Sequence, residues 1–156
     1  MTDYGLMAEQ ALGFAEGCTW DITLYANISA LIFDTLEDLN WAGFYLMRDG
    51  ELVLGPFQGK PACMRIPVGK GVCGTAVKED RVLRVDDVHL FKGHIACDSA
   101  SDSEIVLPLH LDGRIIGVLD IDSPVRSRFT LKDEEGLRKI TGVIEECLKN
   151  GLRNRD

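Results

Sequence analysis

The sequence lacks the features that mark nucleic-acid-binding, membrane and secreted proteins. Its 17 lysines and arginines are outnumbered by 25 aspartates and glutamates, and a net charge of -8 argues against binding to a phosphate backbone. No apolar run is long enough to cross a bilayer, and Met1 to Tyr4 show neither the basic nor the apolar region of a signal peptide. We therefore expect a cytoplasmic protein that binds neither nucleic acid nor membrane.

The cysteines also lack a spacing pattern that would identify them as disulfide-forming, metal-binding or catalytic. There are 5 of them, an odd number that cannot form a complete disulfide framework within the chain. No tight Cys-x-x-Cys pair is present, so a zinc site of Cys63, Cys73, His94 and Cys97 would have a spacing unlike that of common zinc modules. We predict no metal, and clustered cytosolic thiols then favour catalysis or redox sensing.

The 156 residues suit a single domain, 1–156, with helices at both ends and strands between them. Apolar residues at helical spacing predict helices over residues 4–15 and after Thr19, the second with a stripe that continues to Leu39. Thr130 and Asp133 predict the capping box of a last helix. Six short apolar segments predict an antiparallel sheet, at residues 41–47, 52–57, 64–66, 82–85, 105–110 and 115–122. This order is typical of an α+β fold whose terminal helices cover one face of the sheet.

Alternation of side chains along the strands predicts what faces a pocket on the opposite side. Trp41 and Tyr45 share one face of their strand, and Ile116, Val118, Asp120 and Asp122 share one face of theirs. A strict two-residue turn at 112–113 would send Glu104 to the other face. We predict an irregular register, through a bulge at Gly113 or at Pro108, that brings Glu104 beside Asp120.

One polar loop stands out, because it carries a thiol and several acids immediately before an apolar strand. It runs from His94 through Cys97 to Glu104 and is rich in serine, alanine and aspartate. So many polar groups are costly to bury in a core, whereas loops on a rigid scaffold are common places for chemistry. The loop predicts a cysteine-based redox site.

Four segments together resemble the free methionine-(R)-sulfoxide reductases, which are built on a GAF domain. The likeness covers nearly the whole chain and rests on three cysteines in three separate family-like contexts. The segments are Gly59-Lys60-Pro61-Ala62-Cys63, Gly69-Lys70-Gly71-Val72-Cys73-Gly74, His94-Ile-Ala-Cys97-Asp98 and Leu119-Asp120-Ile121-Asp122-Ser123.

The resemblance implies that Cys97 is the nucleophile, Cys63 the resolving thiol and Cys73 an auxiliary thiol. It implies a substrate pocket and reduction of the oxidised enzyme by thioredoxin, with no bound cofactor. The residues that it places around the substrate are Trp41, Tyr45, Glu104, Asp120 and Asp122. Whether Cys63 or Cys73 forms the main disulfide with Cys97 stays open, because bridging depends on Cα distances.

The chemistry of these residues is consistent with that activity. Crowded carboxyls cannot all ionise, so one of them, Glu104 or Asp122, would keep a proton to donate. The remaining negative charge would attract the ammonium group of a free amino acid, and Trp41 could enclose the S-methyl group. A GAF-type sensor of a small ligand or of oxidant, without turnover, is the alternative function. The first helix could also pair across a homodimer.

Overall fold

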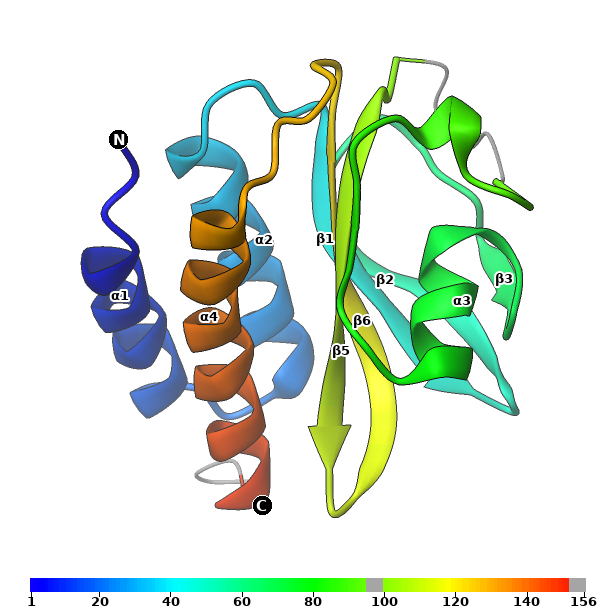
Figure 1. Ribbon diagram of the computed structural model, residues 1–156. Coiled ribbons are helices and arrows are strands. Elements are labelled where there is room, and N and C mark those ends of the chain that lie inside the picture. Colours follow the sequence, from blue (N-terminus) through cyan, green and yellow to red (C-terminus); the bar gives the residue numbers. More distant parts are fainter. Residues whose placement is uncertain (95–99, 152–156) are drawn as a thin grey trace.

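The computed structural model describes residues 1–94 and 100–151, and they form a six-stranded sheet between two unequal layers. Three helices cover one face of the sheet, and a short helix with long loops covers the other (Figure 1). The helices are α1 (Tyr4–Glu16), α2 (Asp21–Thr35), α3 (Gly71–Glu79) and α4 (Leu131–Lys149), with a 3-10 turn at Val88–Leu90.

The strands form one antiparallel sheet in the order β3-β2-β1-β6-β5-β4. All six predicted strands are present, each within two residues of its predicted ends, and the predicted α+β fold is confirmed. Their bounds are β1 (Trp41–Arg48), β2 (Glu51–Gly59), β3 (Arg65–Pro67), β4 (Leu83–Val85), β5 (Ser103–Leu111) and β6 (Arg114–Ser123).

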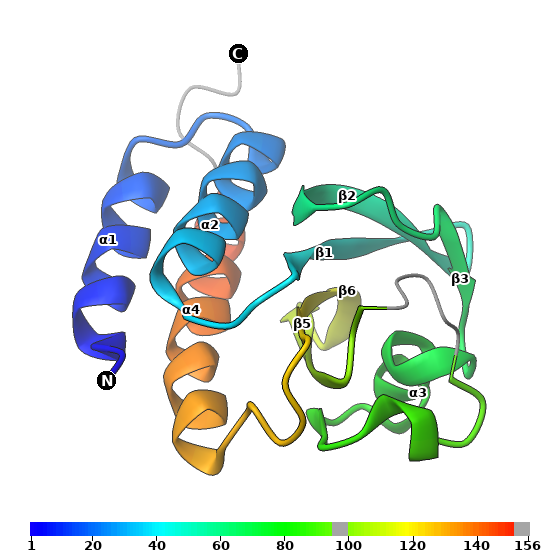
Figure 2. The ribbon, with the colours of Figure 1, turned by 90° about the horizontal axis from the view of Figure 1, so that it is seen from above.

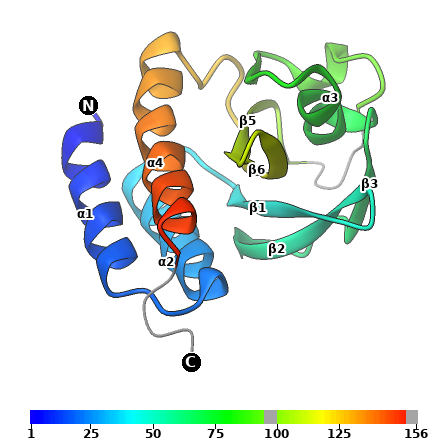
Figure 3. The same cartoon turned by 90° about the horizontal axis from the view of Figure 1, so that it is seen from below.

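The three large helices form two sublayers. Helices α2 and α4 pack on the sheet, and α1 packs outside them, as the views from above and below show (Figures 2 and 3). The stripe predicted to run to Leu39 ends earlier, because Leu36 has an extended backbone (φ -80°, ψ 134°) that stops α2 at Thr35. Among the described residues, no helix has the length and apolar character needed to cross a membrane.

Each face of the sheet buries its own apolar cluster. We call the side of α1, α2 and α4 the helix face, and the opposite side the pocket face. Ala42, Phe44 and Leu119 belong to the helix-face cluster, whereas Trp41 and Tyr45 belong to the pocket-face cluster. Strand alternation therefore places side chains as the sequence predicted for β1.

The predicted irregularity between β5 and β6 is present, one residue beyond Pro108. His110 pairs with Ile115 but Leu109 pairs with Gly117, so Ile116 is the extra residue of a bulge. As a result Glu104 lies opposite Asp122 and shares the pocket face with it. The prediction for Ile116 was wrong: the bulge interrupts the alternation, and this side chain packs with the helix-face cluster.

Candidate functional site

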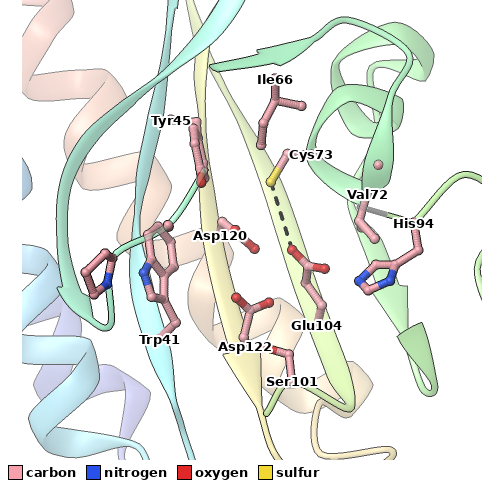
Figure 4. Close-up of a pocket in the computed structure, with 13 residues that line it drawn as sticks. Trp41, Tyr45, Ile66, Val72, Cys73, His94, Ser101, Glu104, Asp120 and Asp122 are labelled. Atoms are coloured by element: carbon pink, nitrogen blue, oxygen red, sulfur yellow. Dashed lines mark hydrogen bonds between the residues drawn. The ribbon is translucent and has the colours of Figure 1, made fainter. Parts of the chain in front are cut away.

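A pocket opens on the pocket face, between the sheet, α3 and the loops that follow β2 and precede β5 (Figure 4). It contains both aromatic side chains and all three acids that the sequence predicted for the site. Its lining consists of Trp41, Tyr45, Pro61, Ala62, Ile66, Gly71, Val72, Cys73, His94, Ser101, Glu104, Asp120 and Asp122. Phe57 stacks against Trp41, with ring centroids 5.2 Å apart, a contact that the sequence analysis did not predict.

Two aromatic side chains of β1 form one wall and also hold the loop that follows β2. The rings of Trp41 and Tyr45 stack with centroids 5.8 Å apart, and both side chains are 2% exposed. Gly43 lies between them, at a register shift where any Cβ would come within 2.3 Å of Phe57 Cβ. The Trp41 indole N–H donates to Lys60 O (3.2 Å), and the Tyr45 hydroxyl donates to Cys63 O (2.9 Å).

Three carboxyl groups meet at the floor of the pocket, where β5 and β6 lie side by side. Glu104 and Asp120 are 8% and 5% exposed, and the side chains of Asp120 and Asp122 point toward Glu104 (Figure 4). Burial, followed by the charges of Asp120 and Asp122, raises the pKa of Glu104 well above its ordinary value. Burial also raises the pKa of Asp120, although hydrogen bonds from Glu104 and Cys73 act in the opposite direction. These directions are those of a protonated Glu104 that donates to its neighbours.

One carboxylate oxygen of Asp120 is available to a ligand. Its Oδ1 is buried and, within residues 1–94 and 100–151, has no hydrogen-bond partner. A buried carboxylate oxygen without a donor is uncommon, because its desolvation is not compensated. This oxygen is therefore ready to accept a hydrogen bond from a ligand in the pocket.

The thiols differ sharply in their surroundings. Cys73, on α3, is 4% exposed, and its Sγ lies 4.0 Å from Glu104 Oε2. Burial, then the charges of Asp120 and Glu104, raise its pKa well above the ordinary value, which disfavours a thiolate there. Cys63 is half-buried and engaged in a disulfide, whereas Cys18, Cys73 and Cys147 are free. The predicted nucleophile, Cys97, lies outside the described residues.

The zinc site that the sequence analysis disfavoured can be compared with the donors that the pocket holds. Cys73, Glu104 and Asp120 have ligand atoms within 4.8 Å of one another, and they are the one such group of metal-binding residues in the described parts of the chain. This set shares only Cys73 with the Cys₃His set considered from the sequence, and its other two donors are carboxyl groups. His94 lines the same pocket, and its pKa is lowered by burial and by the charge of His89, so the ring favours its neutral form.

A family model for the GAF domain matches residues 25–149. The free methionine-R-sulfoxide reductase of Escherichia coli is 61% identical over 132 residues, which cover 85% of this chain and 80% of that protein. The chain belongs to the family of free methionine-R-sulfoxide reductases.

Solved structures of the family have the same fold over nearly the full length. The reduced form of fRMsr of Staphylococcus aureus is 54% identical, with a TM-score of 0.92 over 95% of this chain and 96% of that one. The free methionine-R-sulfoxide reductase of Neisseria meningitidis, in complex with its substrate, is 40% identical, with a TM-score of 0.90 over 94% and 88% of the two chains. The GAF fold and the family predicted from the four segments are thus confirmed.

Proposed function

We propose that this protein reduces free L-methionine-(R)-sulfoxide to methionine through Cys97 and Cys63. The observation that carries the proposal is the pocket itself, in which the buried Glu104 lies beside two further carboxyls and opposite Trp41, with its pKa raised by burial and by those neighbours. This combination suits a small zwitterion that carries an oxygen to be protonated. Membership of the reductase family supports the same substrate.

The carboxyls give a physical reason for selecting a free amino acid. Asp120 Oδ1, which has no hydrogen-bond partner among the described residues, is an acceptor for an ammonium group, and Asp122 adds negative charge next to it. A methionine sulfoxide within a peptide has no such cation, so it would leave this acceptor unsatisfied. The indole face of Trp41 would contact the S-methyl group, and Tyr45 would extend the same aromatic wall.

The first step is a two-electron transfer from the Cys97 sulfur to the sulfoxide sulfur. The Cys97 thiolate attacks that sulfur, Glu104 protonates the oxygen, and the S–O bond of the substrate breaks. The bond between the two sulfurs then breaks, methionine leaves, and the hydroxyl is transferred to Cys97, which becomes a sulfenic acid. Glu104 is favoured over Asp122 as the donor because the pKa of Glu104 is raised so strongly by its burial and by its acidic neighbours.

In the second step the Cys63 thiol attacks the sulfenic acid, a disulfide forms and water leaves. The oxidised state of Cys63, in a structure where Cys73 is a free thiol, supports Cys63 as the resolving residue. Cys73 would serve only as an auxiliary thiol, since burial raises its pKa and disfavours the thiolate that exchange requires. A dithiol of the thioredoxin type then reduces the disulfide, with no bound cofactor.

We also propose that the protein is cytoplasmic and forms a homodimer through α1.

Epimer-resolved consumption of free methionine sulfoxide, with excess dithiothreitol, tests the proposal. We expect the wild type to consume the R epimer alone and Cys97→Ser to lose at least a thousandfold in rate. Cys147→Ser, which removes a free thiol on the helix face, is the matched control and should retain the wild-type rate. A folded, reduced wild type that consumes neither epimer would reject the enzyme and favour a ligand sensor.

A further inference from the structure

We propose that Tyr45 and Trp41 position Cys63 for disulfide formation, through hydrogen bonds to the backbone of the loop between β2 and β3. The inference rests on the proposed function, in which Cys63 resolves the sulfenic acid. It assigns these two side chains a task beyond lining the substrate pocket. The task concerns the second chemical step and not the first.

The loop has little structure of its own, so its position depends on the groups that hold it. Residues 61–63 form neither helix nor strand. Backbone carbonyls anchor the loop along its length: Lys60 O accepts from the Trp41 indole N–H at 3.2 Å, and Cys63 O accepts from the Tyr45 hydroxyl at 2.9 Å. Met64 O accepts from a backbone N–H of β2 at 3.0 Å. Two of these three anchors are therefore pocket side chains.

The start of the loop is fixed against the indole as well. Gly59, the last residue of β2, has φ +131°, and a Cβ there would come within 2.7 Å of both Asn40 O and Trp41 Cδ1. Only a residue without a side chain lets the backbone pass so close to the ring. The chain thus leaves β2 in contact with Trp41 and reaches Cys63 beneath the Tyr45 hydroxyl.

Tyr45 is suited to hold a carbonyl at every pH at which the protein would work. Burial, and then the charge of Asp120, raise the pKa of its hydroxyl above the ordinary value, so the group stays a donor. Its bond ends on the carbonyl of Cys63 itself, next to the Cα that carries the thiol. Disulfide formation tolerates Cα separations of only about 4.4–6.8 Å, so a small displacement of this backbone would slow the second step.

Single-turnover kinetics on pre-reduced Tyr45→Phe separates the two steps. Methionine formation reports the first step, loss of free thiols reports the disulfide, and dimedone labelling with mass spectrometry reports sulfenic acid on Cys97. We expect disulfide formation to slow at least tenfold more than methionine formation, with accumulation of the dimedone adduct. Trp41→Phe, which removes the indole N–H but keeps an aromatic ring, should act in the same direction with a smaller effect.

The matched control is Tyr4→Phe, which deletes another buried tyrosine hydroxyl, one that donates to Asp133 on the helix face. It should leave the ratio of the two rates as in the wild type. Equal slowing of both steps in Tyr45→Phe, or no slowing of either, would overturn the positioning role. A wild type that forms no methionine would instead overturn the proposed function.

Discussion

In the described parts of the chain, carboxyl groups are buried in two places, and their surroundings shift their pKa values in opposite directions. On the helix side, Asp133 at the start of α4 accepts hydrogen bonds from Tyr4 (2.7 Å) and the Thr130 backbone N–H (2.9 Å), and it pairs with Arg128 (3.2 Å). Burial alone would raise its pKa, but the bonds from Thr130 and Tyr4 and the charge of Arg128 outweigh burial and lower it. Asp133 is thus an ionised, fully partnered structural group.

In the pocket, Glu104 and Asp120 have one another, Cys73 and Asp122 as polar neighbours, and no lysine or arginine lines the described parts of the wall. Burial therefore raises the pKa of both carboxyls, and the charges of Asp120 and Asp122 raise that of Glu104 further. The contrast teaches that burial does not by itself set the state of an acid. Where the fold supplies a cation, as Arg128 does for Asp133, the acid is ionised and stabilises the protein. In the pocket, where no cation lines the described parts of the wall, Glu104 favours its protonated form.

Replacing the pocket acid should have the largest effect. For Glu104→Gln we expect kcat/KM to fall about a hundredfold or more, the usual range for loss of a general acid. The wild-type rate should decline on the alkaline side, as Glu104 loses its proton above its raised pKa, and this decline should be absent from the variant's pH profile. Glu9→Gln, an exposed change on α1, is the control. Retention of wild-type activity and of the alkaline decline would remove Glu104 from the chemistry.

Replacing the helix-side acid should affect stability and spare the chemistry. Asp133→Ala removes the capping box of α4 and the carboxylate that pairs with Arg128, so we expect a loss of about 2–4 kcal/mol in the free energy of unfolding. Urea denaturation measures it, with Glu135→Ala, an exposed change in the same turn, as the control. A loss below about 1 kcal/mol, or reduced activity per folded molecule, would contradict the contrast between the two sites.

The smallest expected effect is on the pH dependence of stability. Glu104 and Asp133 should change the slope of stability against pH in opposite directions. Between the ordinary pKa of glutamate and the raised pKa of Glu104, the folded protein keeps a proton that the unfolded chain releases. Stability therefore falls as pH rises through this window, by up to about 1.4 kcal/mol per pH unit. Asp133, whose pKa is lowered, contributes stability that is lost as pH falls through the lowered value.

Urea unfolding of the reduced protein at several pH values in the neutral range tests whether stability falls with rising pH, as predicted for Glu104. The downward slope of the wild type should be smaller in Glu104→Gln, because an amide does not titrate. Equal slopes in the two proteins would mean that Glu104 is ionised in the folded state.

Much of the fold followed from local sequence patterns, because each depends on neighbours along the chain. The Asp49–Gly50 and Asp112–Gly113 turns adopt positive φ angles at both residues, as two-residue hairpins require. The Thr130–Asp133 capping box formed as predicted. The same patterns failed at Leu36, where an apolar side chain stays buried after the helix has ended. The spacing of apolar residues indicates which side chains are buried, and a side chain such as Leu36 can be buried beyond the end of the helix.

The sequence by itself determined the class of fold, the strand faces of Trp41 and Tyr45, and the family to which the chain belongs. Tertiary structure alone decided the site of the β5–β6 bulge, and with it the pairing of Glu104 with Asp122. It also decided that Tyr45 would hold the backbone of Cys63. Both results come from strands and loops that are distant in the chain. Alternation fixes only which face a side chain takes, whereas the register and the packing of loops fix what it meets there.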